Sequence, residues 1–374
     1  MNDCSAVEGD CSSFLLTALR GHKKPVTCLE SDRCSVLISG SSDRTCRLWD
    51  LKSHKTFKCI YGCFDDEIEM VRLGSDTHAV YVQSGNDIQS FDMRYDGLLS
   101  KQPIASLRLN IDGDGISTIA LNSRENLLAI GMDSGNIILV HVDKAGEFCA
   151  DSGGTRYRKL SRVHSNVLST VLFRDDHQTE LLSGGFDYTA AVWDIGRGRP
   201  KASLVFQPAD PSSDCTMMNP PFVMGLEYCL DNKYIVAAVG DGTIRLLKSR
   251  DLQLMTSIAA HSCMITALSC NGRHVVTGGV DAKIHSFILE EAANDELTKE
   301  ATTQSTPSVN KALRPQKAIR VEEPPSLKRT FSISHTAKIN SIVSLFQVST
   351  MEGLPVDLFI ADTTCDISLY SLKQ

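Results

Sequence analysis

The chain has 374 residues and a formal net charge of −7, and 42% of its residues are hydrophobic. The negative balance argues against direct binding of nucleic acid or of an anionic membrane, because phosphate groups attract a surplus of Lys and Arg. No stretch approaches the roughly 18 consecutive apolar residues of a membrane-spanning helix. The 13 cysteines include no Cys-x-x-Cys pair, which predicts reduced thiols in the cytoplasm or the nucleus, without a zinc site or disulfide bonds.

The first 20 residues are acidic and polar apart from a short apolar run in SSFLLTAL, residues 12–19. A secretory signal would need a basic start and a longer apolar region. We therefore expect residues 1–11 to be disordered and residues 12–19 to form a β-strand.

Residues 37–52, LISGSSDRTCRLWDLK, introduce a pattern that recurs along the chain. An Asp lies six residues before an aromatic residue, a hydroxyl residue lies ten before it, and a His opens an alternating apolar run further upstream. The three clear copies are His22, Ser39, Asp43 and Trp49; His164, Ser183, Asp187 and Trp193; and His261, Thr277, Asp281 and Phe287. Three occurrences at fixed offsets indicate a repeated structural unit.

Four weaker copies fill the intervals between and after the clear ones. Each keeps part of the pattern and loses another part. They contain Phe91-Asp92 with Gly85 at the turn; Asp133 without a Trp; Asp241 with Leu247 in place of Trp; and His335 followed by Tyr370. The chain therefore holds seven units at a spacing of about 40 to 54 residues, except for a longer last interval.

The longer interval is explained by residues 291–330, which are polar and include four prolines and little alternation. Such a segment cannot bury enough apolar surface to offset the entropy of ordering, so we expect a disordered insertion before the last unit. Its second half carries six Lys and Arg residues between positions 311 and 330. The segment is interpreted as a solvated loop, with a nuclear-import or partner-binding segment as the alternative.

Within each unit, short runs of apolar and polar alternation are broken by Gly, Asp and Asn, which predicts a meander of antiparallel strands. A repeat of about 40 to 45 residues with Gly-His near its start and Trp-Asp near its end resembles the WD-repeat family. The resemblance implies an all-β, single-domain, seven-bladed WD-repeat β-propeller over residues 12–290 and 331–374. A closed ring also needs an outer strand for the last blade, and we expect the N-terminal strand to supply it.

In WD-repeat proteins the His, hydroxyl, Asp and Trp of one blade form a buried hydrogen-bonded chain. The resemblance implies this structural role for the three sets named above, with the third lacking the indole donor. A His near a Ser and an Asp also invites a catalytic interpretation, but the structural chain accounts for every instance. No phosphate-binding loop, dinucleotide fingerprint or metal-ligand spacing occurs, so we expect no catalytic residue, cofactor or metal, and an enzyme is only the third hypothesis.

A rigid disc with loops on two faces suits the binding of other proteins, and a protein-interaction scaffold is the first hypothesis. In related propellers the residue before the turn aspartate projects from the top face, which makes Phe186 a candidate contact. The order of strong and weak blades also resembles a WD-repeat subfamily grouped among candidate substrate receptors of a cullin-RING ubiquitin ligase. That resemblance implies docking on the damaged-DNA-binding adaptor through a Trp-Asp-x-Arg box, which survives here in degenerate form as Asp92 with Arg94 and as Trp49-Asp50 with Lys52. This receptor role is the second hypothesis.

Overall fold

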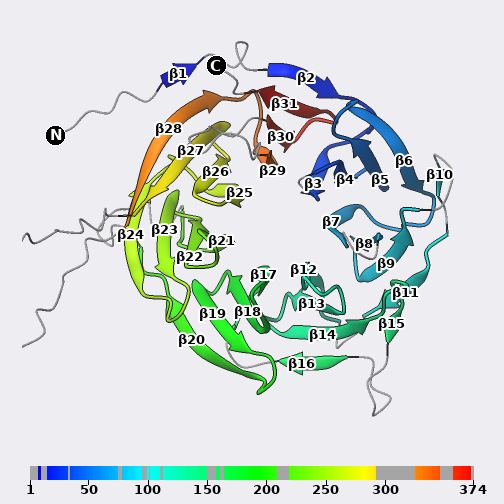
Figure 1. The fold of residues 1–374 in the computed structure, drawn as a ribbon, viewed down its shortest axis with the longest axis horizontal. Helices are drawn as coiled ribbons and strands as arrows, with labels where there is room; N and C mark the ends of the chain where they lie inside the picture. Colours follow the sequence, from blue (N-terminus) through cyan, green and yellow to red (C-terminus); the bar gives the residue numbers. More distant parts are fainter. Residues whose placement is uncertain are drawn as a thin grey trace, which may run out of the picture.

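A computed structural model describes residues 7–9, 15–32, 34–74, 78–94, 99–100, 102–109, 113–149, 157–160, 164–208, 219–291, 325–345 and 357–371. These residues form seven separate β-sheets arranged as blades around a central axis (Figure 1). The predicted all-β, seven-bladed propeller is confirmed. Among the residues described, no helix is long and apolar enough to cross a membrane.

Each blade is a meander of four main strands. The strands of blades one to three are β3 (Val26–Ser31), β4 (Val36–Ser41), β5 (Thr45–Asp50) and β6 (Lys55–Tyr61); β7 (Ile68–Leu73), β8 (Ala79–Ser84), β9 (Asp87–Asp92) and β11 (Ala105–Arg108); and β12 (Ile116–Leu121), β13 (Leu127–Met132), β14 (Ile137–Val142), β15 (Phe148–Cys149) and β16 (Arg158–Leu160). In blade three, β15 and β16 both pair with β14.

Blades four to seven follow the same plan. Their strands are β17 (Leu168–Arg174), β18 (His177–Gly185), β19 (Thr189–Asp194) and β20 (Arg199–Val205); β21 (Val223–Cys229), β22 (Tyr234–Val239), β23 (Thr243–Lys248) and β24 (Leu254–Ala259); β25 (Ile265–Asn271), β26 (His274–Gly279), β27 (Lys283–Glu290) and β28 (Ser326–Ser334); and β29 (Ile339–Leu345), β30 (Asp357–Asp362) and β31 (Ile367–Ser371), completed by β2 (Leu15–Leu19).

The second strand of a blade is buried over most of its length, because both of its faces are covered by neighbouring blades. All six residues of β13, LLAIGM, are buried, as are all six of β22, YIVAAV. The apolar clusters accordingly lie between blades: one joins Leu37 and Trp49 of blade one to Phe359 and Leu369 of blade seven. The core is therefore a ring of layers, and each blade depends on both of its neighbours.

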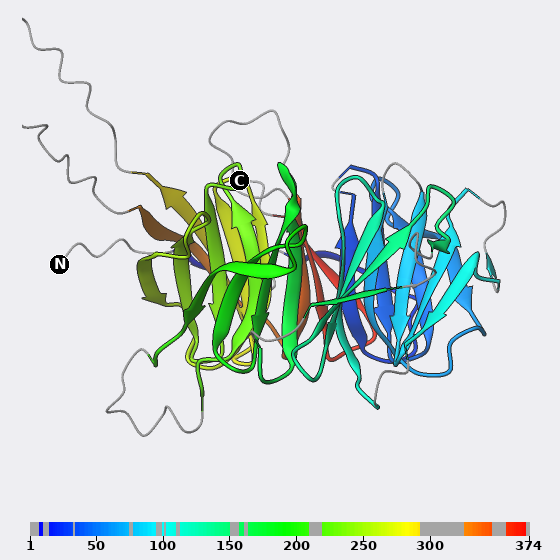
Figure 2. The ribbon, with the colours of Figure 1, turned by 90° about the horizontal axis from the view of Figure 1, so that it is seen from below.

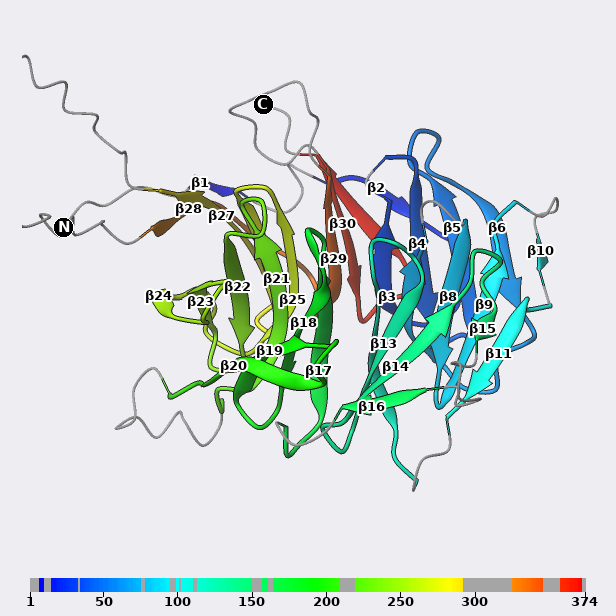
Figure 3. The ribbon, with the colours of Figure 1, turned by 60° about the horizontal axis from the view of Figure 1, so that its bottom comes forward.

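The ring is closed by β2, which pairs antiparallel with β31 and places Leu19 opposite Ile367. The N-terminal strand therefore supplies the outer strand of blade seven, as the sequence predicted. Further strands lie on other outer edges: β10 (Leu99–Ser100) runs parallel to β6, and β1 (Val7–Gly9) runs parallel to β28, as Figure 3 shows for the second pair.

Two domain boundaries differ from the sequence interpretation. Residues 7–9, expected to be disordered, form β1, because the open edge of β28 offers backbone hydrogen bonds that need no apolar pattern in the segment that pairs with it. The strand β28 begins at Ser326, inside the expected insertion, and is the outer strand of blade six. The insertion therefore lies within blade six, before its last strand. The expectation of disorder for 1–6, 10–11 and 292–324 falls outside the described residues.

The disc has two loop faces, seen from the side in Figure 2. Because the strands of a meander alternate in direction, the turns between second and third strands, among them 42–44, 186–188 and 280–282, lie on one face, named here the turn face. The loops between third and fourth strands, among them 51–54 and 195–198, lie on the opposite face, named here the hairpin face.

Candidate functional site

The predicted hydrogen-bonded chains are present in blades one and four. In blade four, Nε2 of His164 lies 2.7 Å from Oγ of Ser183, Nδ1 lies 3.1 Å from Asp187, and the Nε1–H of Trp193 donates to Ser183 at 2.8 Å. Blade one repeats this arrangement. Its distances are 2.7 Å for His22 to Ser39, 3.2 Å for His22 to Asp43 and 2.9 Å for Trp49 to Ser39.

The chemistry of the groups fixes the direction of each bond. A carboxylate only accepts, so Nδ1 of His164 carries the proton and donates to Asp187. Nε2 then accepts a hydrogen bond from the hydroxyl of Ser183, and the Ser183 oxygen accepts one from the indole N–H of Trp193. Burial raises the pKa of Asp187, but the hydrogen bond from His164, the attraction of that ring and backbone N–H donors outweigh it and hold the pKa below its usual value. The side-chain N–H and O–H groups and the ring nitrogens of this hydrogen-bonded set in blade four are thus all paired.

These chains have the order of a catalytic triad but not its exposure. Ser39, Ser183 and Thr277 have no solvent-accessible surface, and each serine oxygen is already engaged by an indole. A nucleophile must reach a substrate, and these hydroxyls cannot. The geometry therefore supports the structural role that the sequence predicted for them.

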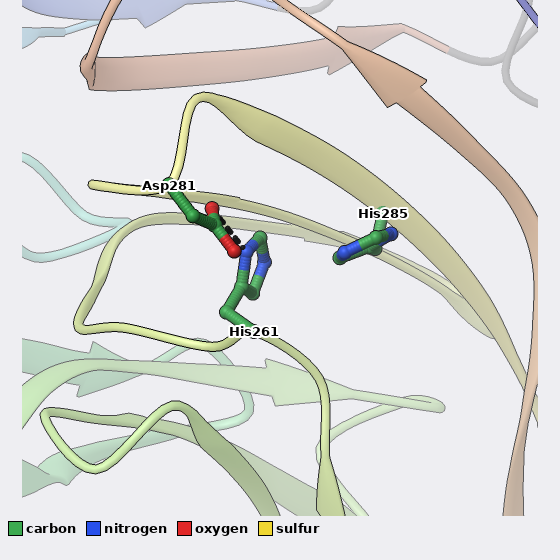
Figure 4. Close-up of side chains that lie close together, drawn as sticks. All are labelled: His261, Asp281 and His285. Carbon is green, nitrogen blue, oxygen red and sulfur yellow. Dashed lines mark hydrogen bonds and ion pairs between the residues drawn. The ribbon is translucent and has the colours of Figure 1, made fainter.

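Blade six contains the third predicted set and one further imidazole. Nε2 of His261 lies 2.9 Å from Oγ1 of Thr277, and Nδ1 lies 2.9 Å from Asp281. The ring of His285, on β27, lies with its centroid 4.5 Å from that of His261 (Figure 4). Burial, with the positive field of His261 and Arg329, lowers the pKa of His285 to about 3, and burial also lowers the pKa of His261.

Blades five and seven use substitutes that the sequence interpretation missed. In blade five, the guanidinium of Arg245 donates to Asp241 at 2.6 Å, and both side chains are nearly inaccessible to solvent. In blade seven, the bonds of the histidine are reversed: Nε2 of His335 lies 2.7 Å from Asp362, and Nδ1 lies 2.6 Å from the hydroxyl of Tyr370. In blade five, the Arg four residues after the turn aspartate was a sequence signal for the substitute. In blade seven, the spacing between Asp362 and Tyr370 has no counterpart in the other blades.

The residues of the degenerate box lie on the hairpin face. The guanidinium of Arg94 donates to both carboxylate oxygens of Asp92, at 3.0 and 2.7 Å, and its side chain remains 62% exposed. Those hydrogen bonds, despite partial burial, lower the pKa of Asp92. Lys52 is exposed in the corresponding loop of blade one. Between them, the buried ammonium of Lys58 donates to the carbonyl of Met93 at 2.8 Å and fixes the end of β9 to blade one.

Phe186 lies on the turn face, so the structure does not bring it together with Arg94. Its ring lies 4.9 Å from that of Phe222, which lies 5.5 Å from the ring of Tyr188. We name these three residues the aromatic cluster. It joins blades four and five, and all three side chains retain solvent exposure, with Tyr188 at 36%. The first strands also enclose an axial channel of about 730 Å³.

Comparison with known proteins agrees with this geometry. The family model of the WD domain, G-beta repeat, matches residues 13–50 and 252–287. The WD repeat-containing protein 53 homolog of Dictyostelium discoideum is 26% identical and covers 96% of this chain and 95% of its own length. The chain is a seven-bladed β-propeller that contains WD repeats. The WD-repeat subfamily that the sequence resembles is that of WD repeat-containing protein 53. The similarity to this homolog supports the resemblance.

Other WD-repeat relatives match less completely. Autophagy-related protein 16 of Arabidopsis thaliana is 23% identical over a match that covers 75% of this chain and 38% of that protein. Among solved structures, the WD40 beta propeller domain of Doa1 superposes with a TM-score of 0.65 at 14% identity, covering 96% of this chain and 97% of that one. This last likeness concerns the fold alone. As in WD-repeat propellers generally, the arrangement suits a protein-interaction scaffold.

Proposed function

We propose that this WD-repeat propeller is a non-enzymatic scaffold that binds other proteins through the aromatic cluster on its turn face. The observation that carries the proposal is the partial exposure of three adjacent rings on turns held by the backbone. The N–H of Phe186 donates to the carbonyl of Val167 at 2.9 Å, and the N–H of Phe206 donates to that of Tyr188 at 2.8 Å. Rigid aromatic anchors lose little entropy on association and often dominate the energy of an interface.

The test compares the proteins that co-purify with the full chain, with the double variant Phe186→Ala/Tyr188→Ala and with Leu254→Ala. We expect the double variant Phe186→Ala/Tyr188→Ala to lose one or more partners at least tenfold, with an unchanged melting temperature. Leu254→Ala is the matched control, because Leu254 is 46% exposed on the outer strand β24, away from the cluster. Equal recovery from all three preparations would exclude the cluster as the binding surface.

A second proposed function is a substrate receptor of a cullin-RING ubiquitin ligase, docking on its damaged-DNA-binding adaptor through the hairpin face. The observation that favours it is the bidentate Asp92–Arg94 pair, which orients an exposed guanidinium at the end of β9. A planar guanidinium in a fixed orientation suits an acidic, aromatic-lined pocket better than an ammonium does. Lys52 occupies the corresponding loop of blade one and supplies a second cation.

The adaptor is tested directly by pull-down with purified wild type and with Arg94→Ala/Lys52→Ala. We expect the double variant to retain less than a tenth of the adaptor. Arg197→Ala is the control, because Arg197 is 70% exposed and pairs with Asp194 in the equivalent loop of blade four, one position later than the box requires. Absence of the adaptor from the wild-type sample would leave the scaffold as the function, and equal retention by all variants would exclude the box.

We also propose a cytoplasmic or nuclear location. Ten cysteines fall within the described residues, and all ten are free thiols, five of them buried in strands: Cys28, Cys46, Cys59, Cys229 and Cys270. Free thiols are typical of reducing compartments. Imaging of the tagged full chain tests this proposal, and accumulation in a secretory compartment would contradict it.

A further inference from the structure

Blade six differs from blades one and four in having a second imidazole beside the turn aspartate. His285 lies four residues after Asp281, at the position held by Arg47 in blade one and by Ala191 in blade four. One ligand atom from each of His261, Asp281 and His285 can be chosen so that all three lie within 4.8 Å of one another (Figure 4). Blade six therefore gathers two nitrogen ligands and one carboxylate where blades one and four have one histidine.

One of these imidazoles has an unsatisfied nitrogen. The side chain of His285 is only 4% exposed, and within the described part of the chain its Nδ1 has no hydrogen-bond partner. Leaving a buried polar atom unpaired destabilises the fold, because the atom has lost its hydrogen bond to water. A metal ion that binds the lone pair of this nitrogen would give it a partner.

The surroundings of His261 and Asp281 resemble the outer shell of a metal site. Nε2 of His261 lies 2.9 Å from the hydroxyl of Thr277, so a proton moved to Nε2 would be donated to that oxygen and would free Nδ1 for an ion. The carboxylate of Asp281 is held by the backbone N–H groups of Ser262 and Lys283, both at 3.2 Å. Two of the three groups are thus held in place by partners that an ion would not displace.

We propose that His261, Asp281 and His285 bind one transition-metal ion of the zinc type, with a fourth position open to water or to a side chain of a partner. Two imidazoles and a carboxylate are a common ligand set for Zn²⁺. Tetrahedral bonds of about 2.0–2.1 Å require ligand atoms roughly 3.3 Å apart. The ring of His285 must therefore move toward the other two ligands on binding. This proposal departs from the sequence prediction, which expected no metal, and it is independent of the proposed function.

Two nearby cations oppose the ion and provide a test of its position. The guanidinium of Arg329 donates to the carbonyl of Ala260 at 3.1 Å and lies 5.5 Å from the centre of the Phe287 ring, beside both histidines. Lys283 lies two residues from each of Asp281 and His285. Removal of the charge at Arg329 should therefore strengthen the binding of a cation at this site and leave binding elsewhere unchanged.

The experiment titrates the chelator-treated full chain with ZnCl₂ by calorimetry and with CoCl₂ by visible absorption. We expect one ion per chain, an intense tetrahedral Co²⁺ spectrum, and at least a tenfold loss of affinity in His285→Ala, which leaves the bonds of His261 intact. His285→Gln serves as a second variant that keeps the volume of the side chain. Arg329→Gln should bind several-fold more tightly, and His141→Ala, which removes an exposed imidazole, should bind like wild type.

Metal binding by wild type that is absent, or that exceeds one ion per chain without saturation, would overturn the proposal. Equal affinity in wild type and in both folded His285 variants would also overturn it, because the ion would then lie elsewhere. Circular dichroism of each variant establishes folding. Since the readout is the ion itself, loss of protein partners in the experiments above would neither support nor weaken this site.

Discussion

Blades four and five are neighbours that bury a turn aspartate with different donors. In blade four, the carboxylate of Asp187 accepts a hydrogen bond from His164, which belongs to the loop before the blade. In blade five, the carboxylate of Asp241 is paired with Arg245, on the third strand of the same blade. The guanidinium of Arg245 also lies 4.9 Å from the ring of Phe206, at the end of β20. Blade five is therefore connected to blade four by an aromatic contact, without a loop histidine.

The difference shows which part of the repeat these two blades have in common. Both blades keep an aspartate in the turn and supply it with a buried donor, but the donor itself can be an imidazole or a guanidinium. Where the indole and the loop histidine are absent, the strand hydroxyl is absent too: Ala237 stands at the position of Ser183. Between these two blades the hydrogen-bonded chain is kept or lost as a whole, whereas blade six keeps His261, Thr277 and Asp281 without the indole.

The largest loss of unfolding free energy is expected from Trp193→Ala in blade four. Trp193 has no exposed surface, and its loss leaves a cavity and an unused acceptor on Ser183. We expect the free energy of unfolding to fall by about 4 kcal/mol in urea titrations. Trp193→Phe keeps most of the volume and should lose clearly less. Equal losses for the two variants would mean that the indole N–H, and not the packing, is the main contribution.

Breaking the pair in blade five should have the next largest effect. Arg245→Met leaves the carboxylate of Asp241 buried without its cation, and we expect a loss of about 3 kcal/mol. The double variant Arg245→Met/Asp241→Asn removes the unpaired charge and should recover a large part of that loss. Additive losses in the double-mutant cycle, again from urea titrations, would show that the two groups do not interact energetically.

The strand hydroxyl provides a reciprocal test of smaller size. Ser183→Ala deprives the indole and the imidazole of their shared partner and should cost about 2 kcal/mol. The converse change, Ala237→Ser, places a hydroxyl in blade five where neither partner exists, and it should cost about 1 kcal/mol. A stabilising Ala237→Ser would contradict the view that the hydroxyl is useful only within the complete chain.

The smallest expected effect is in the pH dependence of blade four. Because the pKa of Asp187 is lower in the folded state, the unfolded state binds more protons as the pH falls through the usual range of a carboxyl, near pH 4. The stability contributed by Asp187 is therefore complete at neutral pH and declines below about pH 4. We expect the difference between wild type and Asp187→Asn to narrow between pH 5 and pH 3 in urea titrations. Asp65→Asn, at a side chain that is 88% exposed, is the control for a carboxylate at the surface.

The sequence was sufficient for the parts of the fold that repeat. The fixed offsets from Asp43 to Trp49 and from Asp187 to Trp193 predicted a repeated unit, and the resemblance to WD-repeat proteins implied the blades and the bonds within them. The closing strand was predicted from the need for an outer partner, which β2 satisfies. These successes rest on local spacing and on the geometry of a closed ring.

Features that depend on one particular pair of neighbours could not be predicted in this way. The reversed bonds of His335 arise because Ile360 replaces the strand hydroxyl and the phenol of Tyr370 reaches the imidazole directly. The edge strand β1 depends on an open strand more than 300 residues away in the sequence. For the same reason the insertion was assigned to the start of blade seven, since nothing in the residues themselves identified β28 as the last strand of blade six.

The pairing of β2 with β31 has a consequence for synthesis on the ribosome. Residues 15–19 leave the exit tunnel long before their partners in β31, residues 367–371, are translated. Until β31 has been made, β2 has no strand to pair with. The apolar layer shared by blades one and seven, which includes Trp49 and Phe359, stays half covered during that time. The circle can be completed only after translation has reached its final blade, so the nascent chain must be shielded from premature association until then.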